Sequence, residues 1–128
     1  MEAEDLHQAA LDRAAQLPAA VLEHPFGPEY DVMKVVGKVF LIASFLGEKP
    51  VVILKADPRD AQLLRENVEA ITPGYHMNKR HWITVEPGPS VDRTQLDELV
   101  TDSYRLVVAG MPRASRPIDP ETFEAPAP

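Results

Sequence analysis

The chain has 128 residues, of which 45% are hydrophobic and 26% charged, with 20 acidic residues, 13 basic residues and no cysteine. This length and composition predict one soluble globular domain, and the lack of cysteine excludes disulfides, thiolate metal sites and cysteine nucleophiles. The net charge of −7 argues against a general attraction to polyanions. The excess acid lies mainly in residues 1–31, so the central body of the chain is close to neutral.

The amino terminus carries acidic residues where a signal peptide needs a basic run followed by an apolar one. No apolar stretch approaches the roughly 20 residues that cross a bilayer. We therefore expect a cytoplasmic protein with no membrane partner.

Residues 3–16 predict an amphipathic helix, because Leu6, Ala10 and Ala14 recur at helical spacing. Pro18 ends this helix or opens a second short turn through residue 22. Residues 24–28 contain two prolines and a glycine, which predicts irregular backbone.

Three segments rich in valine, isoleucine and phenylalanine follow, at residues 31–36, 38–46 and 50–56. The breaks between them are short, and this predicts a three-stranded antiparallel meander. Alternation along the second segment puts one set of side chains on one face (Val39, Leu41, Ala43 and Phe45) and Phe40 and Ile42 on the other. The second face of the sheet is therefore expected to be partly covered.

Asp57 and Pro58 form a favourable helix start, and the predicted helix runs to about residue 69. After a turn at Pro73-Gly74 we expect a hairpin with strands at residues 75–78 and 81–86.

Asp92 and Gln95 have the spacing of a capping box. An apolar stripe continues from there to residue 111, and Thr101-Asp102-Ser103 leaves one helix and two helices as open alternatives. The proline-rich segment 112–128 is expected to be disordered. The sequence thus predicts a single domain over residues 1–111, of class α+β. Its antiparallel sheet of about five strands is packed by helices, in the order α-βββ-α-ββ-α(α).

Five short motifs carry a resemblance to a known family: HPFG at residue 24, VGKVF at 36, LKADP at 54, PGYHMNKRHW at 73 and DSYRLV at 102. Together they resemble the MmcQ/YjbR family over roughly residues 4–111. The resemblance implies a CyaY-like, frataxin-like α+β fold and a DNA-binding role. It supplies no established catalytic residues.

The stretch between Glu69 and Glu86 contains no acidic residue. Lys79 and Arg80 lie at the expected hairpin tip, where their charges are suited to phosphate contact. Aromatic side chains beside them, Trp82 among them, are candidates for stacking. His76, Asn78 and His81 are supporting candidates.

A second acid-free stretch, residues 32–47, adds Lys34 and Lys38. If the two stretches lie on one face of the sheet, they form a modest cationic patch. Two to four cations predict weak, salt-dependent binding to double-stranded DNA.

A purely structural use of these residues competes with that hypothesis. A charged hairpin tip is often only solvated, Trp82 is more typical of a core, and each histidine can hydrogen-bond the backbone. His76 and His81 alone cannot complete a metal site, which needs three or four ligands, so no metal or cofactor is predicted. Nucleophile-elbow, dinucleotide-binding, phosphate-loop and zinc-protease motifs do not occur, and we expect no catalytic residue and no enzyme activity.

Two alternatives remain open. One is a protein-interaction or chaperone-like adaptor that uses a sheet face or the acidic first helix. The other is weak, frataxin-like metal binding through an acidic ridge on that helix (Glu2, Glu4, Asp5 and Asp12). A monomer is expected.

Overall fold

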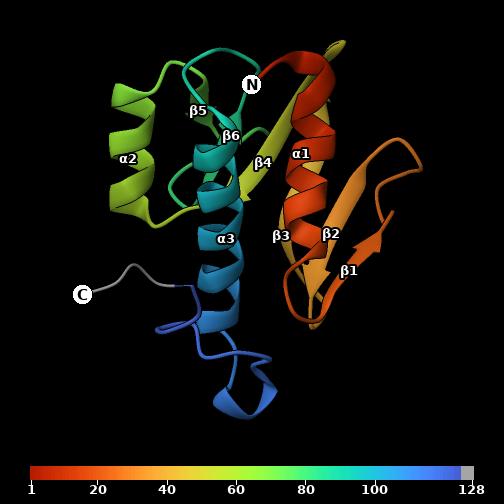
Figure 1. The fold of residues 1–128 in the computed structure, drawn as a ribbon, viewed down its shortest axis with the longest axis vertical. Helices are drawn as coiled ribbons and strands as arrows, with labels where there is room; N and C mark the ends of the chain where they lie inside the picture. The colour runs from red at the N-terminus through yellow and green to blue at the C-terminus, as the bar shows by residue number, and fades with distance from the viewer. Residues whose placement is uncertain (125–128) are drawn as a thin grey trace.

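A computed structural model describes residues 1–124, and it places two helices across one face of a six-stranded antiparallel sheet (Figure 1). The strand order across the sheet is β1-β2-β3-β4-β6-β5. The elements along the chain are α1 (Ala3–Ala15), β1 (Ala20–Glu23), β2 (Asp31–Val35), β3 (Lys38–Leu46), β4 (Lys49–Lys55), α2 (Pro58–Asn67), β5 (Ile71–Pro73), β6 (Trp82–Val85), α3 (Arg93–Ala109) and the 3-10 turn η1 (Arg113–Ser115). This confirms the predicted α+β fold.

The helix starts follow from their capping residues. The Asp57 side chain accepts a hydrogen bond from the Arg59 amide, and Pro58 occupies the first helical position of α2. Asp92 and Gln95 form the complete capping box of α3, which runs unbroken to Ala109, so the last helical region is one helix. Among residues 1–124, no helix is both long enough and apolar enough to span a bilayer.

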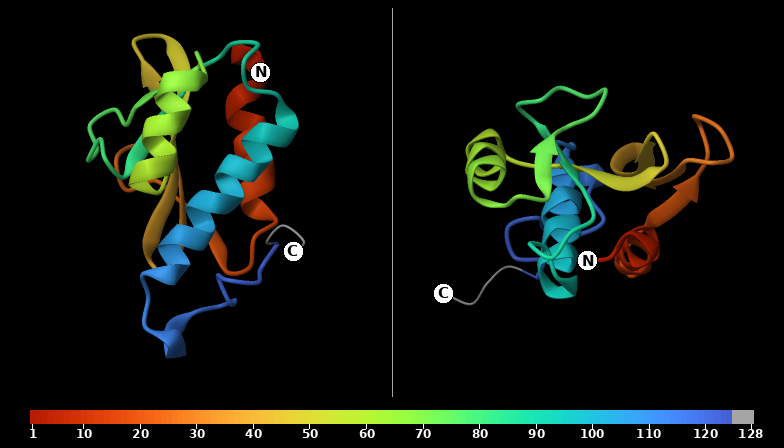
Figure 2. Two further views of the ribbon diagram at one scale, coloured as in Figure 1. Left: turned by 90° about the vertical axis from the view of Figure 1, so that its left-hand side faces the viewer. Right: turned by 90° about the horizontal axis from the view of Figure 1, so that it is seen from above.

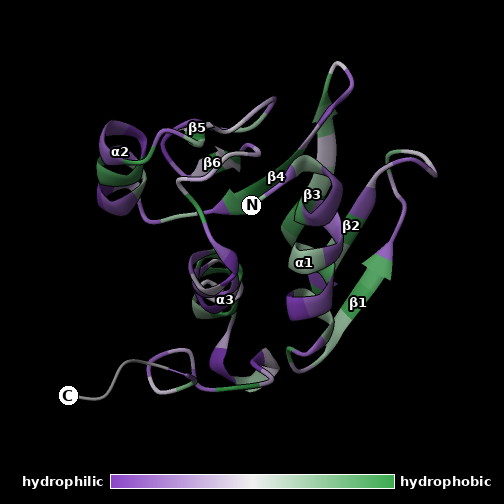
Figure 3. Cartoon of the chain, turned by 45° about the horizontal axis from the view of Figure 1, so that its top comes forward, coloured by the Kyte–Doolittle hydropathy of each residue, from purple (hydrophilic) through white to green (hydrophobic). Residues whose placement is uncertain are grey.

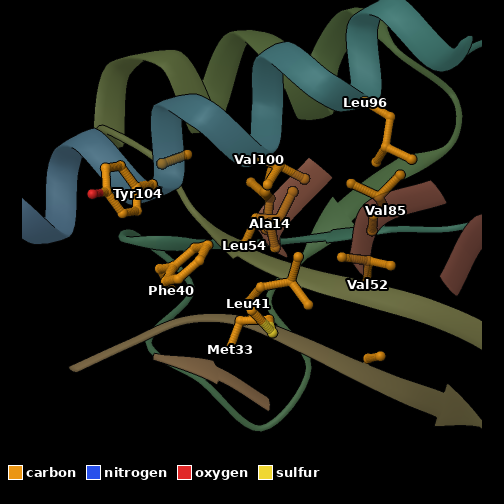
Figure 4. Packing of buried hydrophobic residues seen from close by; sticks show 14 of the residues in the cluster. Ala14, Met33, Phe40, Leu41, Val52, Leu54, Val85, Leu96, Val100 and Tyr104 are labelled. Carbon is orange, nitrogen blue, oxygen red and sulfur yellow. The ribbon is translucent and has the colours of Figure 1, made fainter. Parts of the chain in front are cut away.

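The main core lies between α1, α3 and the sheet (Figure 4). Tyr104 and Phe40 are fully buried there with their rings edge to face at 5.3 Å. The Tyr104 hydroxyl donates to the Pro18 carbonyl at 2.6 Å, and burial raises the pKa of this phenol. Small residues on α1, including Ala10 and Ala14, are fully buried in this core.

An irregularity between β2 and β3 changes which side chains share a face. Met33 pairs with Leu41 while Lys34 pairs with Val39, so Phe40 is one extra residue on β3. Phe40 and Leu41 consequently both join the helix-side core, whereas Val39 packs on the opposite face. The predicted alternation of faces along β3 is therefore wrong at Val39 and Phe40.

The opposite, open face of the sheet carries a smaller apolar cluster. Val32, Ile42 and Ile53 lie side by side on β2, β3 and β4, and Trp82 is half-buried against them. Met77 and Trp82 pack against these three buried side chains, so the second face is partly covered, as predicted. It also means that Trp82 belongs to the open face and not to the main core.

Two strands differ from the sequence prediction. Residues 20–23 form β1, an edge strand where only a turn was expected. Most of β1 is coloured as hydrophobic in Figure 3, and its side chains Val21 and Leu22 are half exposed. The strand expected at residues 75–78 is instead β5, at Ile71–Pro73, which pairs with β6 through Ile71 and Val85. Pro73 is tolerated because β5 is the other edge of the sheet.

The segment after α3 was expected to be disordered, and up to Glu124 the structure differs. Arg116 donates to the carbonyls of Ala109 and Met111, and Arg105 donates to that of Pro120. Phe123 packs beside Tyr104, with ring centroids 5.8 Å apart. Arginine donors and one aromatic ring thus tie a proline-rich segment to the core; residues 125–128 of the expected tail lie outside the described range.

An ion pair joins β4 to the end of β6 and gives a pH-dependent prediction. Lys49 Nζ lies 2.5 Å from Glu86 Oε1, and this hydrogen bond holds the pKa of Glu86 below its ordinary value of 4.5. The stabilisation is therefore complete above pH 4.5 and is lost as the pH falls through the lowered pKa. Because Lys49 is half exposed, Glu86→Gln should cost only about 0.2–1 kcal/mol at pH 7.

Urea unfolding of the wild type and Glu86→Gln at pH 7 and at pH 3 measures this effect. The difference between the two proteins should shrink at the lower pH. A difference that is equal or larger at pH 3 would contradict the assignment.

Candidate functional site

The candidate residues near position 80 lie in the β5–β6 loop, residues 74–81. This loop and the β1–β2 loop, residues 24–30, both project on the side of the sheet away from α1 and α3 (Figure 2). The Gly74 amide donates to the Trp82 carbonyl at 3.0 Å. The hydroxyl of Thr84 accepts from the Tyr75 amide and donates to the Pro73 carbonyl, both at 2.9 Å. The base of the loop is therefore held by β6.

Asn78 shapes the loop from within. Its side-chain oxygen accepts from the Arg80 amide at 2.9 Å, and its carbonyl accepts from the amides of His81 and Trp82. This is a local turn built by a short polar side chain. Asn78 therefore has a structural role, because it fixes the turn that carries Lys79, Arg80 and His81.

Lys79 and Arg80 differ in how their side chains are used. Lys79 Nζ folds back to donate to the Gly74 carbonyl at 3.1 Å, and the Arg65 guanidinium donates to the Lys79 carbonyl, also at 3.1 Å. The Arg80 side chain is exposed and has no hydrogen bond or ion pair within residues 1–124. Of these two cations, Arg80 is the more available to a ligand.

A further cation, Lys55, was not among the predicted site residues. It ends β4 as the cross-strand partner of Trp82, and its Nζ lies 6.0 Å from the centroid of the indole ring. Such a position favours a cation–π interaction. In the sequence, Lys55 could be recognised only as the last residue of an apolar strand. The strand that pairs with it, β6, is not evident from the local sequence.

We call Lys55, Arg65, Lys79 and Arg80 the cationic cluster. They come from β4, α2 and the β5–β6 loop, and contacts through Trp82 and the Lys79 carbonyl join these elements. None of the four forms an ion pair with a carboxylate within 4 Å in the described part of the chain, although other basic residues do. The cluster therefore presents uncompensated positive charge on an acidic protein.

Lys34 and Lys38 do not join this cluster as predicted. Lys34 lies on β2, and its Nζ pairs with Glu23 Oε1 at 3.3 Å, so it has a carboxylate partner that the four clustered cations lack within residues 1–124. Lys38 begins β3 opposite Val35. Because β4 lies between β3 and β6, the two acid-free stretches are not neighbours in the sheet.

The two histidines of the loop are exposed. His76 has a left-handed backbone with φ of 61° and places its ring 4.0 Å from that of Tyr75. No group of three or more histidine, aspartate or glutamate side chains within residues 1–124 is placed to hold a metal ion. His81 is exposed to solvent, and His76 lies on the part of the loop that faces a pocket on the open side of the sheet.

Known proteins resemble this chain in sequence and in structure. The model of a family described as YjbR matches residues 15–106. YbdF of Escherichia coli O157:H7 is 44% identical over 111 residues, covering 87% of this chain and 91% of its own, and YjbR of Escherichia coli K12 is 34% identical over 84 residues, covering 66% and 71%. The crystal structure of Deinococcus radiodurans protein DR2400, described as a DUF419 domain, superposes with a TM-score of 0.72 at 31% identity, covering 90% of this chain and 85% of that one.

Proposed function

This chain belongs to the YjbR family, and from that premise we propose that it is a cytoplasmic DNA-binding module without catalytic activity. The observation that carries the proposal is the cationic cluster, four basic side chains from three elements with no carboxylate partner within 4 Å in residues 1–124. Lysine and arginine side chains without a carboxylate partner are suited to contact the phosphates of nucleic acids. Arg80 is the primary contact, and Lys55 supports it.

The binding is weak for two reasons. The cluster offers at most four phosphate contacts, and the whole chain carries a net charge of −7. Four contacts correspond to a slope of at most about −4 in a plot of log affinity against log salt concentration. Affinity should therefore fall by about a hundredfold between 50 and 200 mM salt.

A titration of short duplex DNA at several salt concentrations tests the proposal. Arg80→Ala is the informative variant because this side chain supports no other part of the loop, whereas Lys79 also holds the Gly74 carbonyl. Arg80→Ala should weaken binding for every duplex sequence and reduce the salt slope by about 1. Adding Lys55→Ala should reduce the slope again.

Arg113→Ala is the matched control, because Arg113 is exposed on η1 after α3 and outside the cluster. It should leave the affinity and the slope unchanged. Undetectable binding at low salt, or a slope that Arg80→Ala and Lys55→Ala leave unchanged, would reject the proposal. The protein-interaction alternative would then be favoured, with the exposed edge of β1 as the surface to examine.

A further inference from the structure

The open face of the sheet carries a pocket of about 400 Å³ beside the cationic cluster. The aliphatic side chains of its floor are Val39 and Ile42 on β3 and Ile53 on β4, and Ser44 and Phe45 of β3 also line it. This volume is within the range of pockets that hold small organic groups, about 300–1,000 Å³. We call it the open-face pocket.

Two loops that are distant in sequence form the walls of this pocket. The β1–β2 loop contributes Phe26, and the β5–β6 loop contributes Tyr75 and Met77. The Phe26 side chain is 60% exposed and that of Tyr75 is 39% exposed. Aromatic side chains that remain exposed beside an apolar floor are able to stack on a planar ligand.

A cation on β4 lies near the pocket. Among the described residues, no aspartate, glutamate, lysine or arginine lines the pocket, and His76 is the one histidine in its lining. Lys55 lies two residues beyond Ile53 on the same face of β4, about 7 Å further along the strand. An aromatic pocket lined by no lysine, arginine or carboxylate side chain of the described chain therefore lies next to a cation that approaches Trp82.

We propose that the open-face pocket holds an unpaired base of a single-stranded nucleic acid, while the cationic cluster contacts the adjacent phosphates. A neutral apolar peptide would use the pocket but would have no use for Lys55 and Arg80. A duplex would reach the cations but keeps its bases stacked and out of the pocket. Neutral planar groups on an anionic backbone satisfy both surfaces. This inference rests on the proposed phosphate contacts and adds the class of nucleic acid.

The test compares two ten-nucleotide strands of equal charge, oligothymidylate and its abasic analogue, at low salt. Fluorescence anisotropy of a labelled strand measures the affinity, and the emission of Trp82, the single tryptophan, reports contact at the sheet face. Oligothymidylate should bind about tenfold more tightly than the abasic strand, because stacking on aromatic side chains adds affinity for each base. An arm with oligouridylate shows whether RNA is preferred to DNA.

Tyr75→Ala should remove most of the preference for bases and leave the salt slope unchanged. Its matched control is Leu63→Ala, which removes a large apolar side chain, 52% exposed, from α2 outside the pocket. The control should keep the full preference. Circular dichroism of each variant verifies that the fold is intact.

The outcomes separate this inference from the proposal on which it rests. Equal affinity for the thymidylate and abasic strands, with a normal salt slope, overturns the pocket inference and leaves phosphate binding in place. A base preference that survives both Tyr75→Ala and Phe26→Ala also overturns it. Failure of every strand and duplex to bind at low salt rejects the proposed function itself.

Discussion

Replacing Ser103 by alanine is expected to lower the free energy of unfolding by about 2–4 kcal/mol. Ser103 is fully buried on α3; its hydroxyl donates to the Phe40 carbonyl at 2.5 Å and accepts from the Lys55 amide at 2.8 Å. Leu41 and Leu54 form the last pair of β3 with β4, so the hydroxyl lies where the next pair would close. Alanine leaves the buried Phe40 carbonyl and the part-buried Lys55 amide without this partner, and an unsatisfied buried group costs about 1–3 kcal/mol.

Urea unfolding monitored by far-ultraviolet circular dichroism measures this loss. Ser115→Ala is the control, because Ser115 is exposed on η1 and an exposed substitution usually changes stability by less than about 0.5 kcal/mol. A loss below about 1 kcal/mol for Ser103→Ala would show that β3 and β4 close over the site or that water replaces the hydroxyl. Either result would contradict the bridging role.

Gly74→Ala is expected to destabilise the protein by about 2–3 kcal/mol and to displace the β5–β6 loop. A Cβ atom at Gly74 would lie 2.6 Å from Trp82 Cβ and 2.8 Å from the Trp82 carbonyl oxygen. The same carbonyl accepts the Gly74 amide at 3.0 Å, so the two segments cannot separate without losing that bond. Overpacking against backbone typically costs about 1–3 kcal/mol, and the lost bond adds to it.

Gly110→Ala is the matched control for this substitution. Gly110 ends α3 in a right-handed conformation, with φ of −80°, and an added Cβ would meet its nearest atom at an ordinary 3.6 Å. Alanine there should be neutral or slightly stabilising, by up to about 1 kcal/mol. Urea unfolding of both variants, followed by Trp82 emission, gives the comparison. Equal stabilities would mean that the β5–β6 loop relaxes freely around residue 74.

Local chemistry made much of the fold predictable. The meander of β2, β3 and β4 follows from runs of β-branched and aromatic residues with short breaks, and the starts of α2 and α3 follow from Asp57 and Asp92. β1 escaped prediction because Ala20 and Glu23 carry no strand signal, and its hydrogen bonds to β2 alone define it. The extra residue Phe40 escaped because a bulge is set by the partner strand.

The candidate site was predictable only in part. Lys79 and Arg80 stood out because no acid lies near them in sequence, but the fold decided which cations join them. Strand order brings Lys55 to Trp82 and leaves Lys34 with Glu23 on the far side of β3. Strands that pair can be far apart in the sequence. Neither the approach of Lys55 to Trp82 nor the pairing of Lys34 with Glu23 could therefore be predicted from neighbouring residues.

The placement of α2 has a consequence for how ligand binding and local unfolding are coupled. Within the described chain α2 packs mainly on β5 and β6, and Ala61 is its one buried residue. Elements with so little buried apolar surface open at a lower free energy than the core. Since the Arg65 side chain reaches the Lys79 carbonyl, opening of α2 also releases a restraint on the loop. Any ligand that needs the restrained loop therefore closes α2 by mass action, and hydrogen exchange along this helix becomes a measure of ligand occupancy at the β5–β6 loop.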